Sequence, residues 1–530
     1  MSKLKNGIVV AAHPLAAKAG VKILKSGGNA VDAAVATALS LGSVAPAFSG
    51  IGGGGFALLW LAREERAAFV DYRERAPQAA TANMFEVDTS GNVARSANSE
   101  GYLAVATPGT IAGHSFMLEK YGRLKLKEAI QPAIDYARKG IHVTKTLASA
   151  WSQSTSKLTR SKDSSSIFLK RGKPYREHDR ISFKDLAESL SLIATQGPTE
   201  FYTGKIASRI CEDMESNNGL LTTQDFEKFT PAEREPVRGS FEGLEVISAP
   251  PPSCGGIILV QALNILEQCR LREYDQNSTT ALHLTAEALM RSNRSTRQRV
   301  CDPDYAKIPV DEMITKKYAT SLASDLKTWT TPLSHGTEQP TSSTSHLVVM
   351  DSDHNVVSMT ESIECYFGSG VVAENTGIIL NDTMHDFDPR SGQANSVAPW
   401  KIPMSSMSPT IMLRDGKPFM AVGAAGASRI ISSTLQTILN VVEFHMPLRR
   451  AVAAPRIHTQ DSLLQMEKGI PRSTINELRG MGHVVETGRR DALWRAGLYF
   501  GGVHSAVVKS DNIMEGGSDP RRDGVALGLP

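Results

Sequence analysis

The stretch QPTSSTSHLVVMD, residues 339–351, places five consecutive hydroxyl residues directly before an apolar, β-branched run. Such a cluster is usually a solvated loop, and this interpretation stands for Thr341 and Ser342. A threonine at the first position of a strand has another use, because cleavage of the preceding bond frees its own α-amine. That amine has an unperturbed pKa of about 7.7–8.0, so it can act as general base for the adjacent hydroxyl. The stretch therefore indicates either a linker or a nucleophile at Thr344, released by cleavage after Ser343.

The chemistry of such a cleavage needs no outside protease. The Thr344 hydroxyl would attack the Ser343 carbonyl, and water would hydrolyse the resulting ester. The preceding stretch, 327–343, is polar, aperiodic and punctuated by Pro and Gly, which predicts a flexible segment. Flexibility there would let the two new chain ends separate.

The bulk composition excludes several classes of protein. The chain has 530 residues, of which 41% are hydrophobic, so it can bury a large core. The net charge of +3 is spread without a basic stripe, which argues against nucleic acid and anionic membranes as partners. Five cysteines without a CxxC pair predict neither a disulfide framework nor a zinc site. With no signal-peptide or transmembrane pattern, we expect a soluble, cytoplasmic protein.

Local patterns predict a helix-rich first part and a β-rich last part. Strands are expected at Ile8–Ala12, Phe56–Leu61 and Ala67–Pro77, and Asn29 is expected to cap a buried helix. Residues 108–122, 126–140 and 145–235 have mostly helical patterns, as do 257–269, 431–445 and 472–482. After residue 343 we expect strands at 345–350, 355–360, 377–382, 409–424 and 506–512, the fourth a hairpin through Asp415–Gly416.

The glycine run GIGGGGF, residues 50–56, suggests a phosphate-binding loop. However, it lacks the GK[ST] ending and precedes a strand instead of a helix. The alternative is that the glycines permit a tight backbone path between packed layers.

Taken together, the blocks TSHLVVMDSDHNVVSMT, YFGSGVVAENTGIILND, MHDFDP, PMSSMSPTIM and GAAGASRI resemble, in order and spacing, the γ-glutamyltransferase (glutathione hydrolase) family. DYRERAP and PGTIAGHSFMLEKYG in the first half agree. The resemblance implies an α+β fold, a four-layer αββα sandwich of the N-terminal nucleophile hydrolase type. It also implies a precursor that cleaves itself into a large subunit, 1–343, and a small subunit, 344–530, which together form one αββα unit.

The resemblance implies a role for several residues. Thr344 would be the nucleophile, and Ser362 would bond to its hydroxyl in a place where Thr is usual. Backbone amides of Gly426 and Ala427 would form the oxyanion hole, where the family usually has two glycines; this requires that φ at Ala427 is not positive. Arg73, Ser405 and Ser406 would hold a substrate carboxylate, and His346 is expected to be a structural residue of the strand.

The expected ammonium site departs from the family pattern. Asp386 is kept, but Glu364 replaces the usual Asn and Thr383 replaces Gln or Glu. The main hypothesis is therefore an amidase acting on γ-glutamyl amides such as glutathione, through an acyl-enzyme, by hydrolysis or by transfer to an amino acid or peptide. The alternative is a related amidase for another acyl group, of the oxamate amidohydrolase or cephalosporin acylase type. A remote alternative is an unprocessed ligand-binding protein.

The partners implied are a small amide substrate, the two subunits of one precursor, and possible further copies in an oligomer. We expect no cofactor and no metal. Asp382, His385, Asp386 and Asp388 are potential ligands, but their spacing fits no common metal site.

Overall fold

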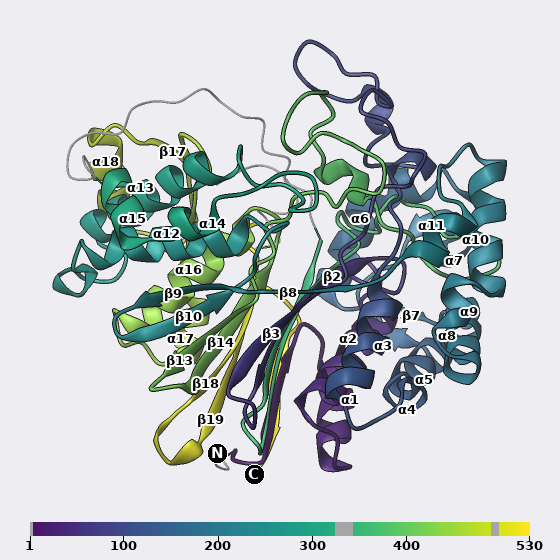
Figure 1. The fold of residues 1–530 in the computed structure, drawn as a ribbon, viewed down its shortest axis with the longest axis horizontal. Coiled ribbons are helices and arrows are strands. Elements are labelled where there is room, and N and C mark those ends of the chain that lie inside the picture. The colour runs from purple at the N-terminus through teal and green to yellow at the C-terminus, as the bar shows by residue number, and fades with distance from the viewer. Residues whose placement is uncertain (1–3, 324–342, 489–497) are drawn as a thin grey trace.

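The computed structural model describes residues 4–323, 343–488 and 498–530. Within these residues two antiparallel sheets pack face to face at the centre of the molecule (Figure 1). One sheet has seven strands in the order β20-β1-β11-β12-β2-β3-β8, and the other has six in the order β19-β18-β14-β13-β10-β9. The first contains β1 (Gly7–Ala11), β2 (Gly54–Leu61), β3 (Arg66–Asp71), β8 (Ala232–Arg234), β11 (Ser345–Asp351), β12 (Val356–Ser362) and β20 (Val525–Leu529). The second contains β9 (Val237–Phe241), β10 (Leu244–Ser248), β13 (Thr410–Arg414), β14 (Lys417–Ala425), β18 (Gly502–Val508) and β19 (Met514–Ser518).

Helices cover the outer face of each sheet. Helices α1 (Pro14–Lys25) and α2 (Ala30–Val44) pack against the seven-stranded sheet, and α5 (Gln131–Lys139) and α8 (Lys184–Gln196) extend this layer. Helices α12 (Gly255–Glu267) and α16 (Arg429–Val442) cover the six-stranded sheet. Figure 1 shows the first group on the right and the second on the left. The predicted four-layer αββα sandwich is thus confirmed.

The two-residue period of the strands explains how one sheet serves two cores. Along β1, Val9 and Ala11 point into the cluster beneath α1 and α2, whereas Ile8 and Val10 point into the cluster between the sheets. Successive side chains of a strand face opposite sides. Because both faces are covered, β1 is apolar at each of these positions instead of alternating.

Local capping signals fix the first helices as the sequence predicts. Asn29 Oδ1 accepts bonds from the amides of Val31 at 2.9 Å and Asp32 at 3.1 Å, and the Asp32 carboxylate accepts from the Asn29 amide at 2.8 Å. This capping box satisfies amides that would otherwise lack partners at the start of α2. The predicted cap at Asn29 is confirmed.

The glycine run is a close-packing device. A Cβ built on Gly52 would lie 2.1 Å from the Ile379 carbonyl oxygen, and one on Gly53 would lie 2.1 Å from that of Ser362. Both distances are far below a normal contact, so no side chain fits. The run therefore lets the chain pass directly beneath residues 362 and 379, in agreement with the tight-path interpretation.

The other elements of the first part are mainly helical. They are α3 (Thr110–Tyr121), α4 (Leu126–Ala129), α6 (Lys145–Leu158), α7 (Lys162–Phe168), α9 (Thr199–Tyr202), α10 (Lys205–Ser216), α11 (Thr223–Lys228), α13 (Thr279–Thr296), α14 (Val310–Met313) and α15 (Lys316–Leu322), with the short strands β4 (Ile141–His142), β5 (Leu169–Lys170), β6 (Lys173–Pro174) and β7 (Arg180–Ile181) and 3-10 turns at Ala94–Ser96, Tyr102–Ala104 and Leu271–Glu273. The predicted flexible stretch 327–343 lies outside the described residues except for Ser343.

The last part adds a smaller three-stranded sheet to the central sandwich. It contains β15 (Ile457–His458), β16 (Leu463–Met466) and β17 (Val484–Thr487), next to α17 (Leu448–Ala453) and α18 (Arg472–Gly480), and further 3-10 turns lie at Thr383–Asp386 and Ser510–Asn512. The predicted hairpin through Asp415–Gly416 is confirmed as β13–β14. The predicted strand at 377–382 is wrong: apart from an isolated bridge between Val372 and Ile379, this segment is irregular.

Segments from both sides of the expected cleavage point contribute strands to each sheet. Strands β11 and β12 lie between β1 and β2, and β13 pairs with β10. Neither segment can form its sheets without the other. Among the described helices, none is both long enough and apolar enough to span a bilayer.

Candidate active site

Thr344 lies directly before β11, at the junction that the sequence singled out. The chain is continuous through Ser343 and Thr344, and both are buried. The Thr344 hydroxyl donates to the Ser343 carbonyl oxygen at 2.5 Å, and the Ser362 hydroxyl donates to the same oxygen at 2.5 Å. The two hydroxyl oxygens are 3.3 Å apart. The bond that would be cut therefore has a polarised carbonyl with a nucleophile beside it.

Both sides of this junction are held in place. The Ser343 hydroxyl donates to the Ala47 carbonyl at 2.8 Å, and the Ser343 amide donates to the Glu364 carbonyl at 2.5 Å. Ser362 ends β12, and its Oγ accepts a bond from the Glu364 amide at 2.8 Å. These contacts hold the Ser343 carbonyl and the Ser362 hydroxyl in a fixed position relative to each other.

His346 is a structural residue in its surroundings. It is fully buried on β11, and its Nδ1 lies 2.8 Å from the Thr360 hydroxyl. Burial lowers the pKa of His346 well below its usual range, so the ring is neutral. Its position agrees with the structural role expected from the sequence.

Arg73 is a buried cation at the end of β3. Its Nε donates to the Pro403 carbonyl at 3.0 Å, and its terminal nitrogen forms an ion pair with Asp386. The guanidinium is 1% exposed, whereas the Asp386 side chain is 24% exposed. A cation that is already oriented can form paired, charge-assisted bonds with a substrate carboxylate.

The double serine, Ser405 and Ser406, lies close to this arginine in space. Ser405 is held through its backbone, with its amide bonded to the Pro252 carbonyl at 3.1 Å and its carbonyl accepting from the Cys254 amide at 2.9 Å. The Ser406 hydroxyl accepts a bond from Arg297 at 3.3 Å. Arg297 follows directly after α13. The sequence did not single it out, because nothing near it resembles a binding motif.

Glu364 and Asp386 form the acidic side of the site. One carboxylate oxygen of each lies, together with a ring nitrogen of His385, within 4.8 Å of the others. Burial, and next the charge of Asp386, hold the pKa of the Glu364 carboxyl well above its usual range, while Arg73 opposes this rise. Burial and the charge of Asp386 therefore both favour the protonated form of this carboxyl. The group offers ligand atoms for a cation, so the expected absence of a metal stays a prediction.

Glu74 is a further member that the sequence did not single out. Its side chain is fully buried, and one carboxyl oxygen lies 3.9 Å from a guanidinium nitrogen of Arg73. Neither carboxyl oxygen has a hydrogen-bond partner among the described residues. Burial raises the pKa of Glu74 to about 7, and the charge of Arg73 opposes this. Its signal was available, since a second charged residue beside the key arginine of a buried loop is rare. Thr383, in contrast, was predicted, and it lies fully buried in the turn that carries Asp386.

The expected oxyanion loop joins β14 to α16. No described residue accepts a hydrogen bond from the amides of Gly426 and Ala427. Gly426 has φ +131° and Ala427 has φ +52°. The expectation that φ at Ala427 is not positive is therefore wrong: the alanine adopts a left-handed conformation, which costs about 1–2 kcal/mol. It retains its N–H in this conformation, so the amide can still donate a hydrogen bond.

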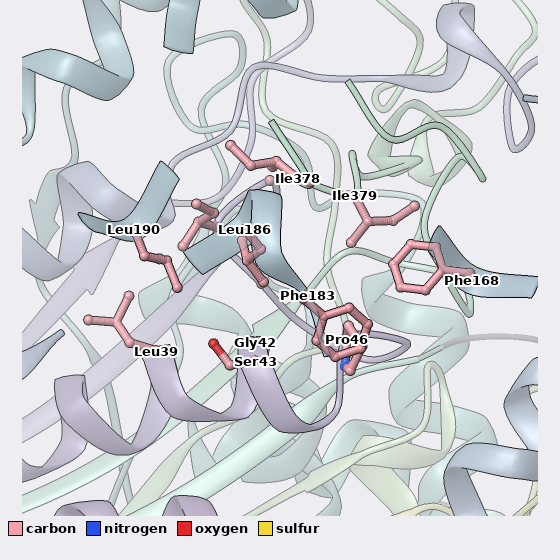
Figure 2. A pocket seen from close by; sticks show the side chains of 14 residues that line it. Leu39, Gly42, Ser43, Pro46, Phe168, Phe183, Leu186, Leu190, Ile378 and Ile379 are labelled. Carbon is pink, nitrogen blue, oxygen red and sulfur yellow. The ribbon is translucent and has the colours of Figure 1, made fainter. Parts of the chain in front are cut away.

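The cavities near these residues are small. Thr344 and Ala425 line one of about 20 Å³ together with His504 and Arg522. Figure 2 shows another of about 20 Å³, in which Leu39, Leu186 and Ile379 surround the end of α2. Its lining is apolar and its volume holds about one water molecule, so it is a packing gap and not the substrate site.

Comparisons with known proteins agree with this geometry. The family model described as Gamma-glutamyltranspeptidase matches residues 16–529. The chain is 38% identical to the Glutathione hydrolase proenzyme of Escherichia coli (strain K12), over 98% of this chain and 91% of that protein. It is 37% identical to the Acylase ACY 1 proenzyme of Pseudomonas sp. (strain SE83), over 99% and 93%. The solved structure of a cephalosporin acylase from Bacillus halodurans superposes with a TM-score of 0.86 at 26% identity, covering 100% of this chain and 97% of that one.

Proposed function

The chain belongs to the gamma-glutamyltranspeptidase family and is a self-processing γ-glutamyltransferase-like amidohydrolase, and we propose that it cleaves γ-glutamyl amides such as glutathione with Thr344 as the nucleophile. One observation carries the substrate assignment. Arg73 and Asp386 present opposite charges side by side, and Ser405 and Ser406 lie in the loop that follows Asp386. This arrangement is complementary to the zwitterionic head of an amino acid.

The first reaction is cleavage of the chain itself. The Thr344 Oγ attacks the Ser343 carbonyl carbon, the C–N bond breaks, and the Thr344 nitrogen takes up a proton. Water then hydrolyses the ester, giving a Ser343 carboxylate and the Thr344 hydroxyl. The hydrogen bond from Ser362 to the Ser343 oxygen supports this step, because it stabilises the charge that develops there.

The mature enzyme repeats this chemistry on a substrate. The freed α-amine of Thr344 takes the proton of the hydroxyl as it attacks the γ-carbonyl. The Gly426 and Ala427 amides, which have no other described partner, are available to the oxyanion, and loss of one such donor costs about 3–4 kcal/mol. The amine leaves with a proton, and water or an amino acid then takes the γ-glutamyl group from the ester.

When the substrate binds, its two charged groups replace the ion pair between Arg73 and Asp386 with two new ones. Its carboxylate replaces Asp386 at the guanidinium of Arg73, and its ammonium takes up Asp386 and Glu364. Thr383, buried beneath this group, is the third residue assigned to the ammonium site. The charge of the ammonium lowers the pKa of Glu364, so a proton leaves as the substrate binds.

A second candidate is an amidase for an acyl group without an ammonium, such as an oxamate or cephalosporin side chain. Glu364 favours it, because burial and Asp386 raise the pKa of this carboxyl and so favour the neutral form, which can donate a hydrogen bond. The acylase relative is also nearly as similar as the glutathione hydrolase. A substrate comparison decides between the two.

The deciding experiment pairs γ-glutamyl-p-nitroanilide with glutaryl-p-nitroanilide, which lacks only the ammonium. We expect the γ-glutamyl substrate to react with at least about a tenfold higher kcat/KM, the equivalent of about 1.4 kcal/mol. Equal rates would establish the non-glutamyl candidate. A denaturing gel must also show the wild type as two chains and the Thr344→Ala variant as one; a cleaved variant would mean that an outside protease acts. An uncleaved wild type would support the ligand-binding alternative.

Two further expectations stay predictions. The cytoplasmic location rests on composition alone. An oligomer beyond the two subunits has no support from the geometry of the described residues.

A further inference from the structure

Three side chains with metal-binding atoms meet on the far side of the six-stranded sheet from Thr344, where α13 packs against the turn after α18. His283 and Glu287 lie four residues apart on α13, so they share one face of the helix. His483 follows α18, and its Nε2 lies 2.8 Å from Nδ1 of His283. One ligand atom from each of the three lies within 4.8 Å of the other two.

The carboxylate of this group lacks a partner for one of its oxygens. Glu287 is 4% exposed, and no described residue hydrogen-bonds to its Oε1, while its Oε2 accepts a bond from Arg291 at 3.2 Å. A buried carboxylate oxygen without a partner is costly. A cation between the carboxylate and the two imidazoles would supply the missing contact.

Both histidines are buried. His283 is 3% exposed and His483 is 5% exposed. The imidazole of histidine is the commonest metal ligand in proteins.

We propose that His283, Glu287 and His483 bind Zn²⁺ and so join the two chains produced by cleavage. Two imidazole nitrogens and one carboxylate oxygen are a known zinc donor set, which leaves the fourth tetrahedral position to water, whereas Mg²⁺ and Ca²⁺ prefer oxygen ligands. Zinc–nitrogen bonds of about 2.0–2.1 Å in a tetrahedral site place two nitrogens about 3.3 Å apart. The observed 2.8 Å needs a separation of only about 0.5 Å, which small side-chain rotations provide.

The location explains what such a site would do. His283 and Glu287 precede the cleavage point and His483 follows it, so the metal would connect the large and the small subunit. Leu282 and Ala286, which precede the two ligands on α13, belong to an apolar cluster with Ile457, Leu464 and Leu478. Apolar surroundings limit the access of solvent to a metal site.

The test is metal content measured by mass spectrometry. The cleaved protein is stripped with EDTA, dialysed against ZnCl₂ and freed of loose metal. We expect about one Zn²⁺ per pair of chains, and the same content in a control that lacks two exposed histidines, His142→Ala/His178→Ala. The double variant His283→Ala/His483→Ala should retain less than about a tenth of this amount.

Glu287→Gln guards against a variant that fails to fold, because it keeps the shape of the side chain. We expect it to retain its circular dichroism but to bind Zn²⁺ at least about tenfold more weakly, the usual effect of losing one group of a metal site. The inference rests on the proposed cleavage only for the joining role, so uncleaved Thr344→Ala must bind the same amount. Wild type that takes up no Zn²⁺, or Glu287→Gln that binds as tightly as wild type, would overturn the site.

Discussion

Replacing Glu364 by Gln gives the sharpest test of how the substrate head is recognised. Burial and the neighbouring Asp386 raise the pKa of Glu364 and so favour its protonated form before the substrate binds. Glutamine has the same size and also donates a hydrogen bond as a neutral group. The variant should therefore fold and cleave itself like the wild type, and any effect should appear only when the substrate binds.

The size of the effect follows from the bond that is lost. In the complex we expect an ionised Glu364 beside the substrate ammonium. Hydrogen bonds to charged groups contribute about 1.5–3 kcal/mol and neutral ones about 0.5–1.5 kcal/mol. The difference of about 1–1.5 kcal/mol predicts an increase in KM of about five- to twelvefold for Glu364→Gln. Glu364→Ala loses the whole bond, which predicts about ten- to a hundredfold.

The pH dependence has a definite sign. Below the raised pKa of Glu364 the ammonium can bind only by displacing a proton, so KM for the γ-glutamyl anilide should fall as pH rises toward that pKa. Above it KM should level off. Glu364→Gln has no such proton, and the ratio of variant to wild-type KM should therefore grow with pH. The Thr344 amine titrates in both proteins, so it cancels in this ratio.

The assay compares kcat and KM for the γ-glutamyl and glutaryl anilides between pH 5 and 9. Glu374→Gln, an exposed glutamate ten residues further along the chain, is the matched control and should behave as wild type. A KM that rises equally for both substrates, or a ratio that does not change with pH, would refute an ionised Glu364 at the ammonium.

Three other predictions follow from single contacts. Arg73→Lys keeps the charge but not the bond from Nε to the Pro403 carbonyl, so kcat/KM for carboxylate-bearing substrates should fall at least about tenfold; an unchanged value would exclude direct contact, and the exposed Arg390→Lys is the control. Ser362→Ala removes a donor to the carbonyl that is cut and should slow self-cleavage about tenfold on a time-resolved gel, whereas Ser362→Thr should restore it; equal rates would assign no role to the hydroxyl. Burial raises the pKa of Glu74 from 4.5 to about 7, so ionisation of this acid above pH 7 destabilises the folded protein. Glu74→Gln should therefore raise the free energy of unfolding by up to about 3 kcal/mol above pH 7 and leave it unchanged below about pH 4.5. Urea unfolding at both pH values measures this difference, and a gain in stability at low pH would contradict the stated cause.

Features encoded within a few residues could be predicted from the sequence. The cap at Asn29 needs only Asp32, three positions on, and the β13–β14 hairpin needs only the Asp415–Gly416 turn. The strand at Thr344 likewise follows from the β-branched run after it. The resemblance then supplied Arg73 and Asp386, which meet only because β3 and the loop after β12 lie at the same end of one sheet.

Features made by distant segments could not be predicted in this way. Residues 377–382 have the composition of a strand, but their amides bond irregularly, as when Leu380 donates to the Val371 carbonyl at 2.9 Å and Asn381 to that of Gly52 at 3.1 Å. Nothing local encodes the second of these partners. The same holds for His483, whose partner His283 is 200 residues away, although the spacing of His283 and Glu287 was visible.

The two reactions that we propose for Thr344 would use the same nucleophile with different stabilising groups. In the uncleaved chain the Ser343 carbonyl oxygen accepts from the Ser362 hydroxyl, while no described residue accepts from the amides of Gly426 and Ala427. Those amides are held at positive φ, and at Ala427 this conformation is strained. A strained residue such as Ala427 persists only where the surrounding structure enforces it, and here β14 and α16 fix both ends of the loop. In the proposed mechanism self-cleavage would therefore leave these two amides available for the oxyanion hole, and release of the Thr344 amine would add the base to them.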